Sequence, residues 1–454
     1  MFARSAFISE FPGRWVLYWL ILPNLAFILM WLIGGPPMVP IFLRCGIAAL
    51  VIAQLPWVWV KRTSLVVMAS WSTFYYVSTM FNINPTQYNV LLSFLLEVRP
   101  MRSPEYFVGA VALIGSIVLA LRQAPHVARF TSPMPYFLAV VALMVLLTGD
   151  YLATSSTRGS YRGAPPPGTE FASAVQQGGI TGPDVHRRHL VIVMVEALGV
   201  PTGATEQALF SADWNREGWN ASYDVTSGTV PFYGSTTRGE MRELCGRWAN
   251  YDQVAEFAQE CLPARYAQQG YETHAIHGFA SSMFDRENWY RQIGFGSVMF
   301  RDELIQQGLS SCAGVFEGAC DREIPALIGA RLKQADAPQL IYFLTLNTHL
   351  PVGADAGLGT AKCALGSAEW AERYPQVCRL FLLHHYLAEE IDLLAMDIDL
   401  PPTDFLIVGD HSPPFFDRTN RARFDGENVP WVMLRHRSDQ PGGGINVLLE
   451  PAIL

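Results

Sequence analysis

The sequence has few charged residues and no excess of positive charge. Of its 454 residues, 16% are charged, and 40 acidic residues outnumber 32 basic ones. A net-acidic chain repels the phosphate backbone, so this balance argues against non-specific binding to nucleic acids. The sequence also has no C-x-x-C pair, which disfavours a zinc site built from cysteines.

The charges that are present are unevenly distributed along the chain. Residues 1–155 contain 9 basic and 4 acidic residues, whereas residues 156–454 contain 23 basic and 36 acidic ones. Half of all residues are hydrophobic, which is too many for a wholly soluble protein. The asymmetry predicts a membrane part at 1–155 and an acidic soluble part after it.

Long apolar runs fill the membrane part. Each is close to the ~20 residues that a helix needs to cross the hydrocarbon core. Tryptophan and tyrosine lie near their ends, as is typical of interfacial anchors. The first run lacks a small-residue cleavage site, so it is not a removable signal peptide. We therefore expect five transmembrane helices, at about 15–35, 38–60, 63–83, 106–122 and 135–153.

The basic residues predict the orientation of these helices. They fall in alternate loops, and cytoplasmic loops are the ones enriched in Lys and Arg. Five crossings from a cytoplasmic N-terminus put everything after residue 153 outside. This pattern predicts a multi-pass protein of the bacterial inner membrane with a periplasmic soluble domain, from Arg4, Arg14, Lys61, Arg62, Arg122 and Arg129.

Six of the seven cysteines lie in the soluble part, in close sequential pairs. An even number of cysteines in an exported domain indicates disulfide bonds. Sequential pairing is one of 15 connectivities that six cysteines allow. It would join Cys245 to Cys261, Cys312 to Cys320 and Cys363 to Cys378.

The soluble part follows a segment rich in Gly, Pro and Ser, which we interpret as a linker at 156–186. The domain at 187–454 contains continuous apolar runs at 189–197, 339–349 and 404–411. Such runs are typical of parallel strands buried on both faces. They predict an α/β, doubly wound domain.

Each of these runs ends in a polar residue that can bind a metal. Glu196 ends the first, His349 the second, and Asp410 with His411 the third. Ligands of open α/β sheets bind at the carboxyl ends of the strands, so these side chains could share a divalent ion. Taken singly, Glu196 could instead cap a helix, Asp410 could form an Asx turn, and His349 could be a loop histidine.

The order of these motifs resembles the alkaline-phosphatase/sulfatase superfamily, in its membrane-anchored phosphoethanolamine and phosphoglycerol transferase branch. The resemblance rests on "VIVMVEALG", with Glu196, and on "FLIVGDHSPPF", with Asp410 and His411. It implies five N-terminal spans and a periplasmic sulfatase-like domain. It also implies a divalent metal at these residues and a nucleophilic threonine, with Zn²⁺ preferred and Mn²⁺ as the alternative.

The segment "GSTTRGEM" lies where the family has its nucleophile, and the resemblance assigns that role and a place among the metal ligands to Thr236. Thr237 is the alternative. A threonine hydroxyl needs activation, which metal coordination supplies. The following "RGEMRELCG" predicts a helix whose N-terminus favours a phosphoryl group. Ser235 or Thr236 could also simply cap this helix.

The segment 271–295 resembles the family's His-Gly stretch and implies that His277 and Arg286 bind phosphate. His349, in "LNTHLP", matches a later substrate-side histidine. The lipoteichoic-acid-synthase relatives have an Asp and a Trp where this chain has Phe279 and Phe284, which weakens the glycerol-phosphate interpretation.

A helical loop near 84–105 points to the headgroup. Asn89, Ser93 and Glu97 are spaced by four residues, which puts them on one helical face. The lipid A phosphoethanolamine transferases have a similar Asn, Thr and Glu, and a carboxylate there would bind the ammonium of ethanolamine. The alternative is a polar face of an interfacial helix.

The sequence thus predicts a transferase that moves phosphoethanolamine from phosphatidylethanolamine to a cell-envelope glycan or lipid A, through a phospho-threonine intermediate. The alternatives are a phosphoglycerol transferase using phosphatidylglycerol, a sulfatase-like phosphodiesterase, and a non-catalytic membrane scaffold. The family's extra histidine after the Asp-His pair has no match here, which leaves the acceptor open.

Overall fold

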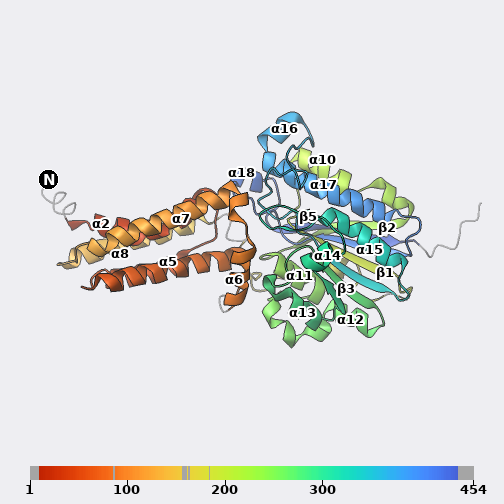
Figure 1. Cartoon of the computed structure of the whole chain (residues 1–454), viewed down its shortest axis with the longest axis horizontal. Coiled ribbons are helices and arrows are strands. Elements are labelled where there is room, and N and C mark those ends of the chain that lie inside the picture. Colours follow the sequence, from red (N-terminus) through yellow and green to blue (C-terminus); the bar gives the residue numbers. More distant parts are fainter. Residues whose placement is uncertain (1–9, 85–86, 156–160, 162–163, 184, 438–454) are drawn as a thin grey trace, which may run out of the picture.

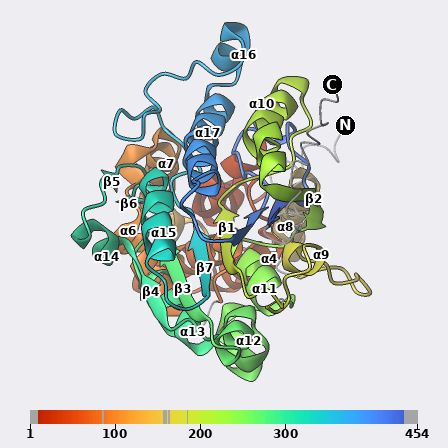
Figure 2. The same ribbon diagram turned by 90° about the vertical axis from the view of Figure 1, so that its right-hand side faces the viewer.

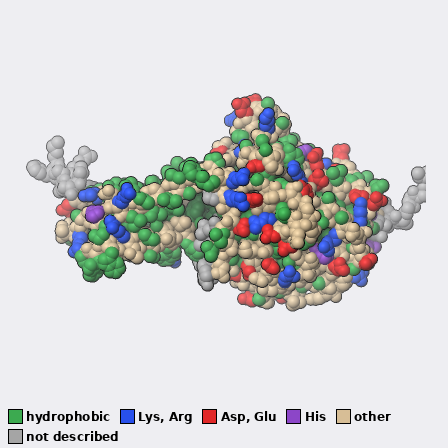
Figure 3. All heavy atoms as spheres, in the orientation of Figure 1, with side chains coloured by type: hydrophobic (Ala, Val, Ile, Leu, Met, Phe, Trp, Pro, Cys, Tyr) green, Lys and Arg blue, Asp and Glu red, His purple; other side chains and the backbone are tan. Residues whose placement is uncertain are grey.

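The chain forms an elongated molecule with a helical bundle at one end and an α/β domain at the other (Figure 1). This computed structural model describes residues 10–84, 87–155, 161, 164–183 and 185–437. Hydrophobic side chains cover the bundle, whereas charged side chains are spread over the α/β domain (Figure 3). The two parts therefore differ in surface chemistry as the charge distribution predicts.

The bundle packs around its own apolar core, which includes Trp15, Phe42 and Leu143. Its first segment, Gly13–Leu32, passes from α-helix through short π and 3₁₀ stretches. The other long helices are α4 (Val39–Ile52), α5 (Val58–Phe81), α7 (Pro104–Gln123) and α8 (Pro133–Ala153).

Three segments of the described chain, rather than the predicted five, are long and apolar enough to cross a membrane. They are Gly13–Leu32, Pro104–His126 and Pro133–Ala153. Helix α4 has 14 residues, which is short of the ~20 needed. Helix α5 has 24 residues, but Lys61, Arg62 and its many Ser, Thr, Tyr and Trp side chains reduce its hydropathy. The prediction of five spans is therefore wrong by these criteria.

A mixed seven-stranded sheet forms the centre of the α/β domain, in the order β2-β9-β8-β1-β7-β3-β4. Strands β8, β1, β7, β3 and β4 run parallel to one another, and β9 joins β8 and β2 through antiparallel pairings at one edge. The three runs identified in the sequence form the adjacent strands β8, β1 and β7. The strands are β1 (His189–Val195), β2 (Tyr223–Pro231), β3 (Glu272–His277), β4 (Ser297–Met299), β7 (Gln339–Leu344), β8 (Thr403–Gly409) and β9 (Asn428–His436).

Helices cover both faces of this sheet (Figure 2). Alternate residues of β1 explain why: Ile192 belongs to the apolar cluster on one face and Val193 to the cluster on the other. The first face carries α11 (Thr236–Cys245), α12 (Leu262–Gln268) and α13 (Arg286–Gln292), and the second carries α10 (Ala204–Trp214), α15 (Ile324–Lys333) and α17 (Pro375–Ala395). The shorter elements are α9 (Ala174–Gln177), α14 (Arg301–Gln306), α16 (Ala368–Arg373), α18 (Arg418–Arg421), β5 (Ser311–Cys312) and β6 (Gly318–Ala319).

The three disulfide bonds join the sequential cysteine pairs, so the expected pairing is confirmed. The bond between Cys245 and Cys261 links the last residue of α11 to the residue that precedes α12. The disulfide fixes the C-terminal end of α11. The first turn of the helix lies against the sheet edge described below.

Polar contacts join the bundle to the α/β domain. Asn84 donates a hydrogen bond to Asp252 at 2.6 Å, and Arg421 donates to the carbonyl oxygen of Ile33 at 2.8 Å. Ser235, just before α11, donates to the carbonyl oxygen of Phe81 at the end of α5, at 3.2 Å. The bundle therefore contacts the segment that carries the predicted nucleophile.

Candidate metal centre and active site

The side chains after β1 and β8 meet because these strands are parallel neighbours. Glu196 follows β1 and Asp410 follows β8, and Val195 pairs with Gly409 in the register. The Oδ1 of Asp410 accepts hydrogen bonds from the backbone N–H of Ala197 at 2.9 Å and of His411 at 2.6 Å. These bonds fix one oxygen of Asp410 and leave the other directed toward the site.

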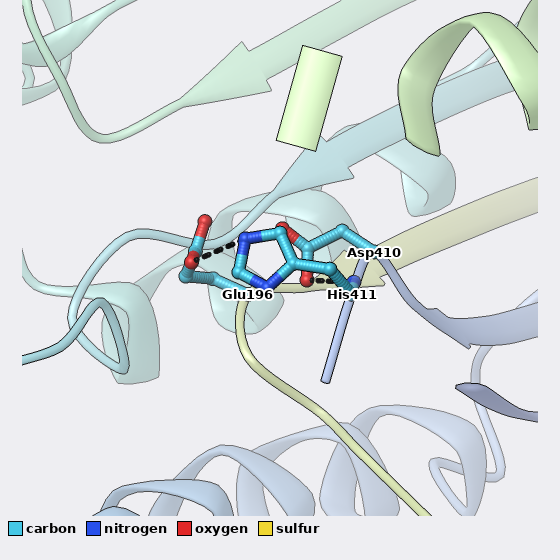
Figure 4. A group of neighbouring side chains, drawn as sticks. All are labelled: Glu196, Asp410 and His411. Atoms are coloured by element: carbon cyan, nitrogen blue, oxygen red, sulfur yellow. Dashed lines mark hydrogen bonds and ion pairs between the residues drawn. The ribbon is translucent and has the colours of Figure 1, made fainter. Parts of the chain in front are cut away.

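Glu196, Asp410 and His411 form a buried group with the composition of a metal site (Figure 4). One ligand atom from each lies within 4.8 Å of the others. The His411 Nε2 is 3.4 Å from Glu196 Oε1 and 3.3 Å from Asp410 Oδ2. Neither of these buried oxygens accepts a hydrogen bond from the described part of the chain. Two buried oxygens facing one imidazole suit a divalent cation.

The titration of the group points the same way. Burial and the adjacent Glu196 carboxylate raise the pKa of Asp410 to about 7. Burial alone would lower the pKa of His411, but the carboxylates of Asp410 and Glu196 outweigh it and raise that pKa. Two buried carboxyl groups this close together favour a neighbouring positive charge, which a cation would supply.

Thr236, rather than Thr237, reaches the metal-binding group. Its Oγ1 donates a hydrogen bond to Glu196 Oε2 at 3.0 Å and lies 3.4 Å from His411 Nε2. The nearest polar contact of Thr237 is the Ser235 hydroxyl, at 3.4 Å. Ser235 is the N-cap residue but makes no side-chain capping bond. The hydroxyl of Thr236 is thus held against Glu196 and His411, at the N-terminus of α11.

Gly239 allows α11 to lie against the end of β8. A Cβ at this position would stand 3.1–3.2 Å from the backbone oxygen and Cα of Asp410 and from its Cβ. A side chain here would push the helix, and Thr236 with it, away from Asp410.

His277 and His349 lie in the same cavity as Thr236, in neutral form. The Nδ1 of His277 is 3.0 Å from the carbonyl oxygen of Leu344, and that of His349 is 2.8 Å from the carbonyl oxygen of Leu350. Since a carbonyl oxygen only accepts, each Nδ1 carries the proton and each Nε2 presents a lone pair. Burial lowers the pKa of His349 to about 4, and burial with Arg286 lowers the pKa of His277 well below its ordinary value.

Arg286 also lines the cavity and is paired with Glu240 at 2.8 Å. Burial would lower the pKa of Arg286, but the Glu240 carboxylate outweighs it and raises that pKa. The guanidinium is therefore a permanent positive charge in the wall of the cavity that Thr236 also lines. This contact could not be predicted from the sequence, because Glu240 and Arg286 are 46 residues apart.

The cavity has a volume of about 840 Å³ and lies between the bundle and the α/β domain. Its wall includes Phe81, Asn82 and Tyr106 from the bundle. From the α/β domain it includes Thr236, His277, Arg286, His349, His411 and Glu427. The site is thus built jointly by the apolar helices and the α/β domain.

The predicted headgroup residues lie on α6 (Tyr88–Glu97), outside the residues that line this cavity. Asn89 is exposed and Ser93 is half-buried. The Glu97 carboxylate is paired with Arg301 at 2.7 Å. The cavity is lined instead by Glu427, which the sequence analysis missed because nothing in its local sequence marks it.

Comparisons with known proteins give a family and several similar structures. The family model described as Sulfatase matches residues 188–439. A search of curated proteins found no match. Among solved structures, lipooligosaccharide phosphoethanolamine transferase A from Neisseria meningitidis is 15% identical over 87% of this chain and 81% of that chain, with a TM-score of 0.46.

Two further solved structures are similar over the α/β domain. The lipoteichoic acid synthase LtaP from Listeria monocytogenes is 12% identical over 59% of this chain and 72% of that chain, with a TM-score of 0.43. The Streptococcus pyogenes phosphoglycerol transferase GacH, in complex with sn-glycerol-1-phosphate, is 15% identical over 59% of this chain and 78% of that chain, with a TM-score of 0.38. Because the matched family model spans more than half of the residues, this chain belongs to the sulfatase family.

Proposed function

We propose that this protein is a membrane-anchored phosphotransferase that moves phosphoethanolamine from phosphatidylethanolamine to a glycan or lipid A of the cell envelope. The observation that carries the proposal is the position of Thr236. Its hydroxyl contacts Glu196 and His411 in a cavity walled partly by apolar helices. A buried hydroxyl among metal-ligand side chains is the arrangement expected of an activated nucleophile.

The side chains that would hold a metal ion are Glu196, Thr236, Asp410 and His411. Their mixture of oxygen donors with one imidazole suits Zn²⁺, and Mn²⁺ is the alternative. A bound divalent ion would lower the pKa of the threonine hydroxyl and stabilise negative charge on the phosphoryl oxygens.

The reaction proceeds through two displacements at phosphorus. In the first, the Thr236 hydroxyl gives up its proton as its Oγ1 forms a bond to phosphorus, the bond to the diacylglycerol oxygen breaks, and that oxygen takes up a proton in turn. In the second, a hydroxyl of the acceptor forms the new bond and Thr236 leaves as its hydroxyl. The acceptor proton passes to a base, and a proton returns to the Oγ1 of Thr236. His277 and His349, whose Nε2 atoms carry lone pairs, are the candidate bases.

Arg286 and the N-terminus of α11 hold the phosphoryl group during both steps. The guanidinium supplies a fixed positive charge, and the N-terminus of α11, where Thr236 lies, favours an anionic group. Both interactions strengthen as negative charge builds on the phosphoryl oxygens, so they favour the transition state over the bound lipid.

The membrane placement explains how a lipid donor reaches this site. Residues at the ends of α5 and α7, among them Phe81 and Tyr106, line the cavity. Basic side chains gather at the far end of the bundle (Figure 3), which supports a cytoplasmic location for that end. The α/β domain, with its three disulfides, then lies in the periplasm.

Glu427 is the candidate partner for the ammonium group of ethanolamine. Of the acidic residues that line the cavity, Glu196 belongs to the metal-binding group and Glu427 is the remaining one. The Glu427 carbonyl oxygen accepts the N–H of Phe232 at 3.0 Å, four residues before Thr236. An exposed carboxylate close to the nucleophile can pair with a cationic headgroup.

A phosphoglycerol transferase is the second candidate, because Glu97 is paired with Arg301 outside the cavity. Because Glu97 is paired with Arg301, its carboxylate no longer supports an ethanolamine headgroup. A glycerol headgroup needs hydroxyl partners rather than a carboxylate.

Mass spectrometry of the full chain tests the proposal. The metal-loaded protein is incubated with labelled phosphatidylethanolamine or phosphatidylglycerol, and the peptide 230–246 is analysed for an added mass. We expect a phosphoethanolamine adduct on Thr236. An adduct from phosphatidylglycerol alone would favour the second candidate, and no adduct from either lipid would contradict both. Free phosphoethanolamine released without an acceptor would indicate a phosphodiesterase.

A further inference from the structure

Helix α11 begins with Thr236 and also carries Glu240, which binds Arg286. One helical turn after Thr236, about 6 Å along the axis, the Glu240 carboxylate accepts hydrogen bonds from Arg286. The Nε atom lies 3.1 Å and the Nη2 atom 2.8 Å from Glu240 Oε2. Tyr342 donates to the other oxygen, Oε1, at 3.3 Å, and Tyr290 makes a short hydrogen bond to it. Both carboxylate oxygens are therefore occupied.

This ion pair is buried, with Glu240 at 0% and Arg286 at 2% exposure. Moving both charges out of water is costly, and an apolar pair of similar shape often stabilises a fold as well. Stability alone is therefore a poor reason for this pair. The geometry of the pair gives a better reason for it. Glu240 binds the Nε and Nη2 atoms of Arg286, and Nη1 makes no hydrogen bond to any residue in the described part of the chain.

The backbone just before Arg286 has an unfavourable conformation. Phe284 and Asp285 are consecutive non-glycine residues with left-handed φ angles of 54° and 55°. Such conformations persist only where surrounding contacts impose them. The Phe284 ring lies 5.0 Å from the guanidinium carbon, so the ring and Glu240 together confine the guanidinium.

We infer that Glu240 is a positioning residue, which sets the free Nη1 edge of Arg286 at a fixed distance from the Thr236 hydroxyl. Because α11 carries both Thr236 and Glu240, the nucleophile and the contact that holds the arginine share one helix. This inference rests on the proposed function, since it assigns Arg286 to the phosphoryl group on Thr236.

Single-turnover kinetics of the Thr236 adduct test the inference in full-length, metal-loaded protein. Glu240→Gln keeps the shape of the side chain and removes its charge. A misplaced arginine is expected to slow adduct formation by about 100-fold. The final amount of adduct per protein stays near that of the wild type, because a lost orientation changes the rate constant and not the fraction of folded protein. Glu240→Asp, which keeps the charge on a shorter stem, gives an intermediate rate.

Asp404→Asn is the matched control. Asp404 is a buried carboxylate that lies 3.1 Å from Arg188 and sits near the start of β8, about 20 Å along the strand from Asp410. Its loss lowers the melting temperature and leaves the rate constant of adduct formation unchanged. A shared fall in rate for Asp404→Asn and Glu240→Gln would mean that general destabilisation causes the effect, and would overturn the inference.

A double-mutant cycle shows whether Glu240 acts through Arg286. In Arg286→Lys protein, Glu240→Gln is expected to change the rate less than threefold. An equal 100-fold effect in both backgrounds, or a wild-type rate for Glu240→Gln alone, would overturn the inference and leave the proposed function standing. No adduct in the wild-type protein would overturn both.

Discussion

The Nη2 of Arg242 donates a hydrogen bond to the carbonyl oxygen of Gly409 at 2.8 Å. Arg242 lies on α11 and Gly409 ends β8, so this bond ties the helix of Thr236 to the strand that delivers Asp410. Gly239 allows the close approach that the bond requires. This bond therefore helps to hold Thr236 next to the candidate metal-binding group, in addition to their direct contacts.

Replacing Thr236 distinguishes the two adjacent hydroxyls. Thr236→Ala is expected to abolish the adduct, because no oxygen remains beside Glu196 and His411. Thr237→Ala retains adduct formation within a few-fold, since the Thr237 hydroxyl contacts Ser235 instead. Peptide mass spectrometry of both variants provides the measurement. Loss of the adduct in Thr237→Ala alone would mean that Thr237 is the nucleophile.

Metal binding is expected to stabilise the fold. A ligand that binds only the native state at 100 times its dissociation constant adds about 2.7 kcal/mol. Dialysis against a chelator therefore lowers the melting temperature by several degrees, and Zn²⁺ restores it. In Glu196→Gln or Asp410→Asn the melting temperature no longer responds to Zn²⁺. An undiminished response in both variants would place the metal elsewhere.

Acid is expected to destabilise the α/β domain through His384, which is 2% exposed. Burial lowers its pKa from 6.5 to about 4. Between these values the unfolded chain binds more protons than the native one, so the contribution of His384 is fully present above pH 6.5 and is lost as the pH falls toward 4. Melting temperatures at pH 7, 5.5 and 4.5 should fall less steeply in His384→Asn. An unchanged slope would contradict the assignment.

Headgroup selectivity separates Glu427 from Glu97. Glu427→Gln is expected to reduce the rate with phosphatidylethanolamine by about tenfold, in line with the loss of one charge-assisted hydrogen bond, and to leave phosphatidylglycerol unaffected. Glu97→Gln removes the pair with Arg301 and changes the rates with both lipids equally. If Glu97→Gln selectively lowered the phosphatidylethanolamine rate, the headgroup partner predicted from the sequence would be the correct one.

The disulfide at the end of α11 is expected to stabilise the domain. Cys245 and Cys261 are 16 residues apart, and closing a loop of this size contributes about 3 kcal/mol. Replacing both cysteines with serine should lower the melting temperature by about 5–10 °C. A melting temperature within 1–2 °C of the wild type would mean that packing alone holds α11.

The central strands, and the meeting of Glu196, Asp410 and His411 at one sheet edge, could be predicted because their signals are local. A buried apolar run ending in Glu196, or in Asp410 and His411, reports both its strand and its position at the sheet edge. The helix at Asn89, Ser93 and Glu97 could also be predicted from spacing, and α6 forms there. The partner of its Glu97 side chain could not be predicted, because Glu97 and Arg301 are about 200 positions apart in the sequence.

The features that could not be predicted arise from packing between distant segments. Glu427 lines the cavity because β9 follows it and pairs with β2 beside the nucleophile. The contact of Glu240 with Arg286 joins two helices that are far apart in the sequence. The number of membrane-crossing segments was overestimated because the apolar runs were judged by length, whereas α4 ends early and α5 is rich in polar and aromatic residues.

The shared wall of the cavity has a consequence for work with truncated protein. A fragment that starts at the α/β domain would keep Thr236 and the metal-binding residues but would lack Phe81, Asn82 and Tyr106. Its site would be an open trough in which water and small phosphodiesters meet the nucleophile freely. Such a fragment would test the chemistry of the threonine without the helices that form one side of the cavity.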